Sequence, residues 1–268
     1  MNNEKNNVLN VSEFFLSIQG EGATTGIPSI FIRLSGCNFA CGLNQMFEKG
    51  LATWKCDSEK VWKTNSPMTY EELYASFESW GEISNIIEGR THLIWTGGEP
   101  TMPQHVKSIV GFLDFFTDLH PEAVGQMYNE IETNGSIPVF QKGFYKPEEI
   151  DGIVVGPYIQ QINCSAKLAN SGMGKPMRIN KRAIEQVLEH PEGYFKFVIS
   201  SEPDILEIQE DFVKPFNIHW KKIILMPAVD NRDDLPAATK FLFDMCKKYG
   251  YRGVTRSHIL AWDRVTGV

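Results

Sequence analysis

The chain contains no run of roughly 18 consecutive apolar residues, the length that a membrane-spanning helix needs. Its start, Met1 to Asn7, is polar and lacks the apolar core of a secretory signal, so we expect a short loose tail over residues 1–8. Basic residues are outnumbered, with 26 Lys and Arg against 33 Asp and Glu. Because binding to phosphate backbones needs a basic surface, the net charge of -7 disfavours general or direct nucleic-acid binding.

Cysteine is also scarce, and the five cysteines cannot all pair. Cys164 and Cys246 lie within apolar segments and are interpreted as buried thiols. Cys37, Cys41 and Cys56 instead lie close together among Gly, Asn and Asp, outside any periodic segment. Clustered thiols suit a metal site in a reducing compartment, so we expect a cytoplasmic protein without a membrane anchor.

Repeats, low-complexity stretches and clear linkers are absent, and the 268 residues fit one domain, residues 1–268. Short apolar segments alternate with amphipathic ones. Strands are predicted at residues 14–18, 29–34, 91–95, 126–132, 159–164, 194–199 and 222–226. Helices are predicted after Thr69, with Glu72 as its capping-box partner, and at residues 106–119, around 184–188, and at 234–249.

This alternation of strands and helices predicts an α/β fold with parallel strands, because parallel strands need crossover connections. We expect a partial (incomplete) TIM-like barrel with an extended cluster-binding loop. Polar and cysteine-rich segments repeatedly follow strand ends, where α/β barrels place their sites. Residues 42–55 are interpreted as an insertion in the cysteine loop, with a helical turn at Met46 to Lys49.

The three clustered cysteines have a specific use. Three thiolates can bind three irons of a cubane and leave the fourth iron open to a small molecule. Zinc is the alternative, but a structural zinc site normally has four protein ligands, and no His lies in the loop. After a predicted strand, Gly97, Gly98 and Glu99 bring backbone donors and a carboxylate together. Such groups suit the charged ends of an amino acid, so we predict a [4Fe–4S] cluster holding S-adenosylmethionine.

Longer motifs follow one another along the chain: Ser17–Gly22, Phe31–Asn38, Cys56–Ser58, Thr96–Pro100, Glu132–Ser136, Ser165–Ser171, Phe195–Val198, Met226–Pro227 and Arg256–Trp262. Together they resemble the motifs of one radical S-adenosylmethionine family, the 7-carboxy-7-deazaguanine synthases. The first motif and Lys167–Ser171 are the most specific. The cysteine gaps depart from the usual three and two residues, since here they are three and fourteen. Lys55 stands where an aromatic residue is expected, with Trp54 one place earlier, and Ala166 and Ser58 replace the commoner Pro and Thr.

The resemblance implies a radical lyase that converts 6-carboxy-5,6,7,8-tetrahydropterin to 7-carboxy-7-deazaguanine with loss of ammonia, in deazapurine (queuosine/preQ0-type) biosynthesis. It also implies Mg²⁺, a flavodoxin- or ferredoxin-like electron donor and a homodimer. The implied substrate-binding residues are Ile18, Gln19, Gly20, Arg33, Thr96, Glu132, His258 and Val268, with His258 and Glu132 as catalytic residues. Cys37, Cys41 and Cys56 would bind the cluster, and Ser58 the Mg²⁺. The S-adenosylmethionine residues would be Gly98, Glu99, Ser165, Ala166, Lys167, Met226, Pro227, Ala228 and Val229.

Other interpretations remain open at this point. Arg33 could form a surface ion pair, Lys167 could be a solvated charge, and His258 could be a core histidine at a strand end. Two alternative functions are a radical activase of another protein and a non-catalytic metal-binding module.

Overall fold

The computed structural model describes residues 7–268, so most of the predicted tail lies outside the described residues. Val8, which we expected in the tail, instead begins β1 and pairs with Thr69. No helix within residues 7–268 is both long and apolar enough to cross a bilayer.

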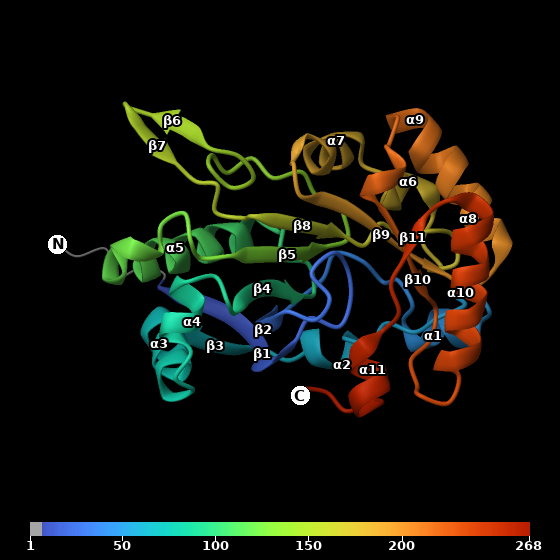
Figure 1. Cartoon of the computed structure of the whole chain (residues 1–268), viewed down its shortest axis with the longest axis horizontal. Helices are drawn as coiled ribbons and strands as arrows, with labels where there is room; N and C mark the ends of the chain where they lie inside the picture. Colours follow the sequence, from blue (N-terminus) through green and yellow to red (C-terminus); the bar gives the residue numbers. More distant parts are fainter. Residues whose placement is uncertain (1–6) are drawn as a thin grey trace.

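A nine-stranded sheet dominates the described part of the chain, in the order β11-β10-β9-β8-β5-β4-β2-β1-β3 (Figure 1). From β2 to β11 every neighbouring pair is parallel, whereas β1 pairs antiparallel with β2 and β3. The order does not close on itself, so the predicted incomplete barrel of parallel strands is confirmed. Its strands are β1 (Val8–Ile18), β2 (Pro28–Leu34), β3 (Ser66–Thr69), β4 (His92–Gly97), β5 (Asn129–Thr133), β8 (Gln161–Cys164), β9 (Gly193–Ile199), β10 (Ile223–Pro227) and β11 (Arg252–Gly253).

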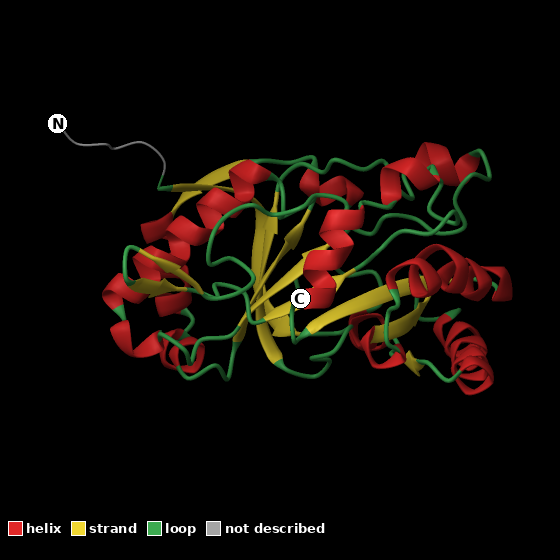
Figure 2. Ribbon diagram, turned by 90° about the horizontal axis from the view of Figure 1, so that it is seen from above, coloured by secondary structure: helices red, strands yellow, loops and turns green. Residues whose placement is uncertain are grey.

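The helices lie around the outside of the fanned, twisted sheet (Figure 2). The larger ones are α3 (Tyr70–Ser79), α5 (Pro103–Leu119), α7 (Lys181–Glu189), α8 (Glu202–Ile208), α10 (Leu235–Tyr249) and α11 (Ser257–Trp262). The short ones are α1 (Asn44–Glu48), α2 (Glu59–Trp62), α4 (Ile83–Ile87), α6 (Lys175–Arg178) and α9 (Lys214–Phe216). The predicted capping box of Thr69 and Glu72 is confirmed at the start of α3, and α1 is the turn expected within the insertion.

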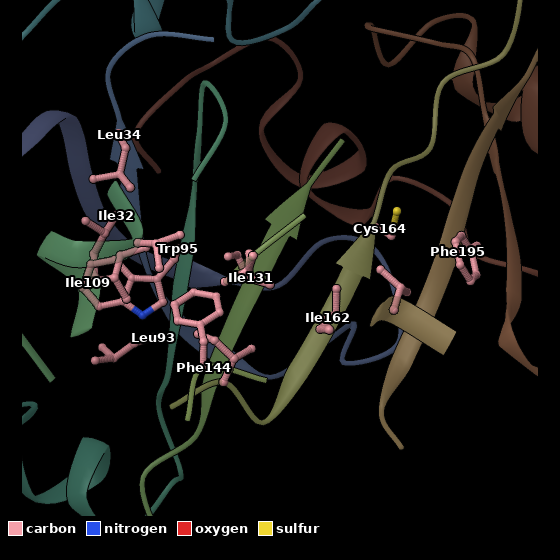
Figure 3. Packing of buried hydrophobic residues seen from close by; sticks show 14 of the residues in the cluster. Ile32, Leu34, Leu93, Trp95, Ile109, Ile131, Phe144, Ile162, Cys164 and Phe195 are labelled. Atoms are coloured by element: carbon pink, nitrogen blue, oxygen red, sulfur yellow. The ribbon is translucent and has the colours of Figure 1, made fainter. Parts of the chain in front are cut away.

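The outward face of the sheet forms the hydrophobic core. Trp95 and Ile131 are fully buried there (Figure 3). Trp95 packs edge-on against Phe112 of α5, with ring centroids 5.7 Å apart. Burying such large apolar side chains is the main favourable term in folding. The helices therefore hold the sheet from outside and leave the inner face to other residues.

The inner face is buried but polar, because strand residues alternate between the two faces. On β5, Glu130 and Glu132 flank the outward Ile131. The β1–β2 loop covers this face: Thr24 donates a hydrogen bond to Glu130 (2.7 Å), and Gly22 lies against Asn163. Buried polar groups require hydrogen-bond partners, and the loop supplies some of them. The polar side chains of the inner face are therefore already held in position.

One element departs visibly from the predicted pattern. Between β5 and β8, the hairpin of β6 (Glu148–Ile150) and β7 (Ile153–Val155) projects from the body (Figure 1). Three-residue strands carry too short a pattern to be recognised in sequence.

Candidate active site

Two loops meet at the carboxyl end of the sheet. The cysteine loop follows β2 and the Gly-Gly-Glu-Pro loop follows β4, its parallel neighbour. The backbone N–H of Gly98 donates to Leu34 O (2.9 Å), and that of Glu99 donates to Gly36 O (3.0 Å). A Cβ on Gly98 would lie 1.5 Å from Gly36 O, so only glycine fits. The start of the cysteine loop is therefore fixed directly against the predicted S-adenosylmethionine motif.

Glu99 has partners within the chain. Its carboxylate is fully buried and accepts hydrogen bonds from Thr101 N (2.9 Å), Thr133 Oγ1 (2.7 Å) and Asn134 N (2.7 Å). Burial raises its pKa, and these hydrogen bonds oppose that effect. Glu99 therefore ties the ends of β4 and β5 together. Its expected contact with the cofactor stays a prediction, because a carboxylate can accept further hydrogen bonds.

The three loop cysteines are free thiols. Cys41 is buried beside Phe39 and Met173, and Cys37 packs partly buried against the same group. Burial raises the pKa of Cys37 to about 12 and also raises that of Cys41, while nearby Lys167 lowers both. Since metal binding requires thiolates, this adjacent cation favours the ligating form.

Three thiols on one loop are a donor set of the kind that an iron–sulfur cluster uses. No group of three or more His, Cys, Asp or Glu side chains within residues 7–268 is arranged to hold one metal ion. Thiolates that bind three different irons of a cubane do not need to converge on one point. Ser58 Oγ lies 3.7 Å from Cys56 Sγ, so the residue expected to bind Mg²⁺ adjoins the third cysteine.

The loop after β8 lies at the same edge of the sheet. Ser165 N donates to Thr133 O (2.7 Å), and the Lys167 ammonium donates to Ser165 Oγ (2.9 Å). Ala166 is buried. At the end of β10, Met226 and Pro227 are buried and Ala228 N donates to Ile199 O (3.0 Å), which anchors this segment of the expected S-adenosylmethionine site.

A buried ion cluster occupies the inner face beside these loops. Glu132, at the end of β5, accepts hydrogen bonds from Gln19 Nε2 (3.3 Å) and Lys196 Nζ (2.7 Å). Lys196 also pairs with Glu21 (2.9 Å). Burial raises the pKa of Glu132 and the lysine lowers it; the two carboxylates outweigh burial and raise the pKa of Lys196. Lys196 therefore lies between two carboxylates, those of Glu132 and Glu21, and forms an ion pair with each.

Arg256 links this cluster to the cysteine loop. Its guanidinium pairs with Glu21 (2.7 Å) and with Asp57, which lies between Cys56 and Ser58, and it donates to Val229 O (2.6 Å). Sequence reasoning assigned no role to Lys196, Glu21 or Arg256, although all three lie within the recognised motifs. A lysine in the middle of an otherwise apolar strand was the available signal.

His258 lies close to the same cluster on the helix α11, so the alternative of a core histidine at a strand end is wrong. Its Nε2 is 3.8 Å from Glu21 Oε1. A Cβ on Gly20 would lie 2.4 Å from His258 Nδ1, so the glycine permits this approach. Burial lowers the pKa of His258, and the imidazole is neutral at pH 7.

Four predicted substrate residues lie further out. Arg33 Nε is 3.0 Å from Glu13 Oε1, so Arg33 forms an ion pair, as in the alternative given above. Its guanidinium also lies 5.5 Å from the centroid of the Phe15 ring. Thr96 is half-buried near the end of β4, opposite Arg33 in register. Val268 lines a surface groove together with Ile18, and each is just over a third exposed.

Comparisons with known proteins agree with this geometry. No family model matches the chain. A 7-carboxy-7-deazaguanine synthase of Koribacter versatilis is 30% identical over 223 residues, covering 82% of this chain and 78% of that protein. One from Pyrobaculum aerophilum is 27% identical over 260 residues, covering 96% of both. The crystal structure of QueE from Escherichia coli has the same fold, with a TM-score of 0.60 and 20% identity over 94% of this chain and 95% of that one. The chain belongs to the 7-carboxy-7-deazaguanine synthase family.

Proposed function

We propose that the chain converts 6-carboxy-5,6,7,8-tetrahydropterin to 7-carboxy-7-deazaguanine with loss of ammonia, as a radical S-adenosylmethionine lyase. The observation that carries this proposal is the meeting of the cysteine loop, the Gly98 loop and the buried ion cluster around Glu132 at one edge of the sheet. A cluster site and a site for a polar bicyclic substrate are thereby neighbours. When bound, the [4Fe–4S] cluster and S-adenosylmethionine supply the radical chemistry.

The residues of the ion cluster have clear binding roles toward the pterin. The Glu132 carboxylate accepts two parallel N–H donors from the guanidine-like edge, and Gln19 reads the adjoining amide. Burial raises the pKa of Glu132 and Lys196 lowers it, so the lysine favours the ionised acceptor, which forms the stronger hydrogen bonds. Because both partners are fixed before substrate arrives, little ordering is needed on binding.

Two further groups would handle charge and protons. Arg33 binds the substrate carboxylate, which shares the guanidinium with Glu13 or displaces it. His258, neutral and beside Glu21, accepts or returns a proton at its Nε2. Ser58 offers a hydroxyl to Mg²⁺, a cation that prefers oxygen ligands. A flavodoxin- or ferredoxin-like reductant, a homodimer and a cytoplasmic location complete the proposal.

Anaerobic reconstitution with iron and sulfide tests it. Wild-type protein is expected to take up iron, to show the visible absorbance of a cluster, and to form the deazaguanine once it is reduced and given S-adenosylmethionine, Mg²⁺ and the carboxypterin. Cys37→Ala removes one thiolate and should lose cluster and product together. Cys246→Ala is the matched control, because Cys246 lies on α10 outside the cysteine loop. A wild-type protein that loads its cluster but forms no product would refute the substrate assignment.

A further inference from the structure

The insertion Gly42–Lys55 pairs with the loop that follows β8. The N–H of Gly42 donates to Ser171 O (2.9 Å), the N–H of Thr53 donates to Asn170 O (2.9 Å), and Ala52 forms an antiparallel bridge with Ser171. Gly42 also accepts a hydrogen bond from Cys56 N (2.8 Å). The insertion therefore connects the third cysteine to the Lys167–Ser171 segment through backbone contacts.

Trp54 extends this connection to side chains. Its indole Nε1–H donates to Asn170 Oδ1 (3.0 Å), and Asn170 is anchored in turn by donating from Nδ2 to Val198 O (2.9 Å). The Lys167 ammonium lies 5.4 Å from the centroid of the Trp54 ring, within the range of a cation–π interaction. The ammonium is thus held between an aromatic face and the hydroxyl of Ser165.

Lys167 has an unusual set of partners for a half-buried cation. Within residues 7–268 no carboxylate forms an ion pair with it, although most other half-buried or buried lysines and arginines near the site have one. An ammonium has three N–H donors, and the structure gives one of them to Ser165. A positioned cation without an internal counter-ion suits an anionic group supplied from outside.

We propose that Trp54 is a positioning residue that holds Lys167 for the carboxylate of S-adenosylmethionine, so that the insertion aligns this lysine with the cysteine loop. This inference rests on the proposed function, because it takes S-adenosylmethionine as the ligand. Trp54, the aromatic residue one place earlier than usual in the cysteine loop, then acts by contacting Lys167 and Asn170. The unusual gap of fourteen residues between Cys41 and Cys56 then supplies the length for pairing with the β8 loop.

The test compares two ligands on anaerobically reconstituted protein. Dissociation constants are measured for S-adenosylmethionine and for 5′-methylthioadenosine, which lacks the amino-acid end and its carboxylate. Trp54→Leu removes both the aromatic face and the indole donor, and should weaken S-adenosylmethionine binding about tenfold, equivalent to about 1.4 kcal/mol. Trp54→Phe keeps an aromatic face and should lose about threefold. Binding of 5′-methylthioadenosine should change less than twofold in both variants.

Trp220→Leu is the matched control, because Trp220 also carries a lysine over its ring but is about half exposed and lies outside these loops. In a Lys167→Met background, Trp54→Leu should cause no further loss, since coupled residues are not additive. Equal weakening of both ligands, or unchanged S-adenosylmethionine binding in Trp54→Leu, would overturn the inference. If Trp54→Leu takes up no iron, the dissociation constants of the two ligands are compared in Trp54→Phe instead, and that comparison tests the inference. A wild-type protein that binds no S-adenosylmethionine would instead refute the proposed function.

Discussion

Replacing Lys196 by methionine tests how the buried ion cluster contributes to stability. Lys196 is 4% exposed, and its ammonium lies 2.7 Å from Glu132 and 2.9 Å from Glu21. Glu21 keeps Arg256 as a partner after the substitution, whereas Glu132 keeps only the uncharged Gln19. Removing one partner of a buried pair typically costs about 3–5 kcal/mol, because the remaining charge is left uncompensated. We expect the lower end, about 3 kcal/mol near neutral pH, because Glu132 can take up a proton.

The loss should depend on pH in a defined direction. Burial already raises the pKa of Glu132, and removing Lys196 takes away the cation that opposes this rise. A carboxyl with a higher pKa in the folded state binds its proton more tightly there, so its contribution to stability falls as pH rises through that pKa. The destabilisation should therefore shrink toward acid pH, by at most about 1.4 kcal/mol per pH unit. The Lys196 ammonium does not add to this change, because its pKa is raised and it stays charged well above neutrality.

Urea unfolding followed by circular dichroism, at about pH 5.5 and about pH 7.5, measures both effects. Lys240→Met is the matched control: Lys240 pairs with Asp244 at 2.9 Å but is exposed, so its loss should cost far less than that of Lys196. The double variant Lys196→Met with Glu132→Gln should recover much of the loss, since no lone charge is then buried at residue 132. A Lys196→Met loss no larger than that of the control, or one that grows toward acid pH, would refute the reasoning.

Three other substitutions give simpler outcomes, all measurable by urea unfolding. Gly98→Ala should lower the free energy of unfolding by at least about 3 kcal/mol and prevent iron uptake, because the added Cβ would lie 1.5 Å from a backbone oxygen. Gly174→Ala is the control and should be nearly neutral, because its Cβ would lie 3.9 Å from the nearest atom. Glu99→Gln should cost about 2 kcal/mol, because an amide group replaces one of the two acceptor oxygens; equal stability would exclude the bracing role. Thr69→Ala removes a helix cap and should cost about 1 kcal/mol with iron uptake unchanged, and a loss of iron would contradict this separation.

Much of the fold was predictable because its signals are local. A buried strand such as Ile223–Pro227 and an amphipathic helix such as Leu235–Tyr249 each carry a readable pattern over a few turns or pleats. The short α11 was not predicted, because six residues carry too little periodicity to separate a helix from a strand end. The alternative that placed His258 at a strand end was wrong for this reason.

The site residues also divide into those with a local sequence signal and those without one. Cys37, Cys41 and the Gly98 motif are recognisable because their chemistry is contained within a few neighbouring residues, and the sequence alone identified them. The Glu21–Lys196 and Glu21–Arg256 pairs join residues 175 and 235 positions apart. Only the order of the parallel strands and the path of the β1–β2 loop bring such side chains together, and burial then sets their charges. The sequence by itself therefore determined which cofactor chemistry this protein is built for. The tertiary structure decided which charged groups form the buried ion cluster and that Glu99 links the ends of β4 and β5, because those contacts join distant segments.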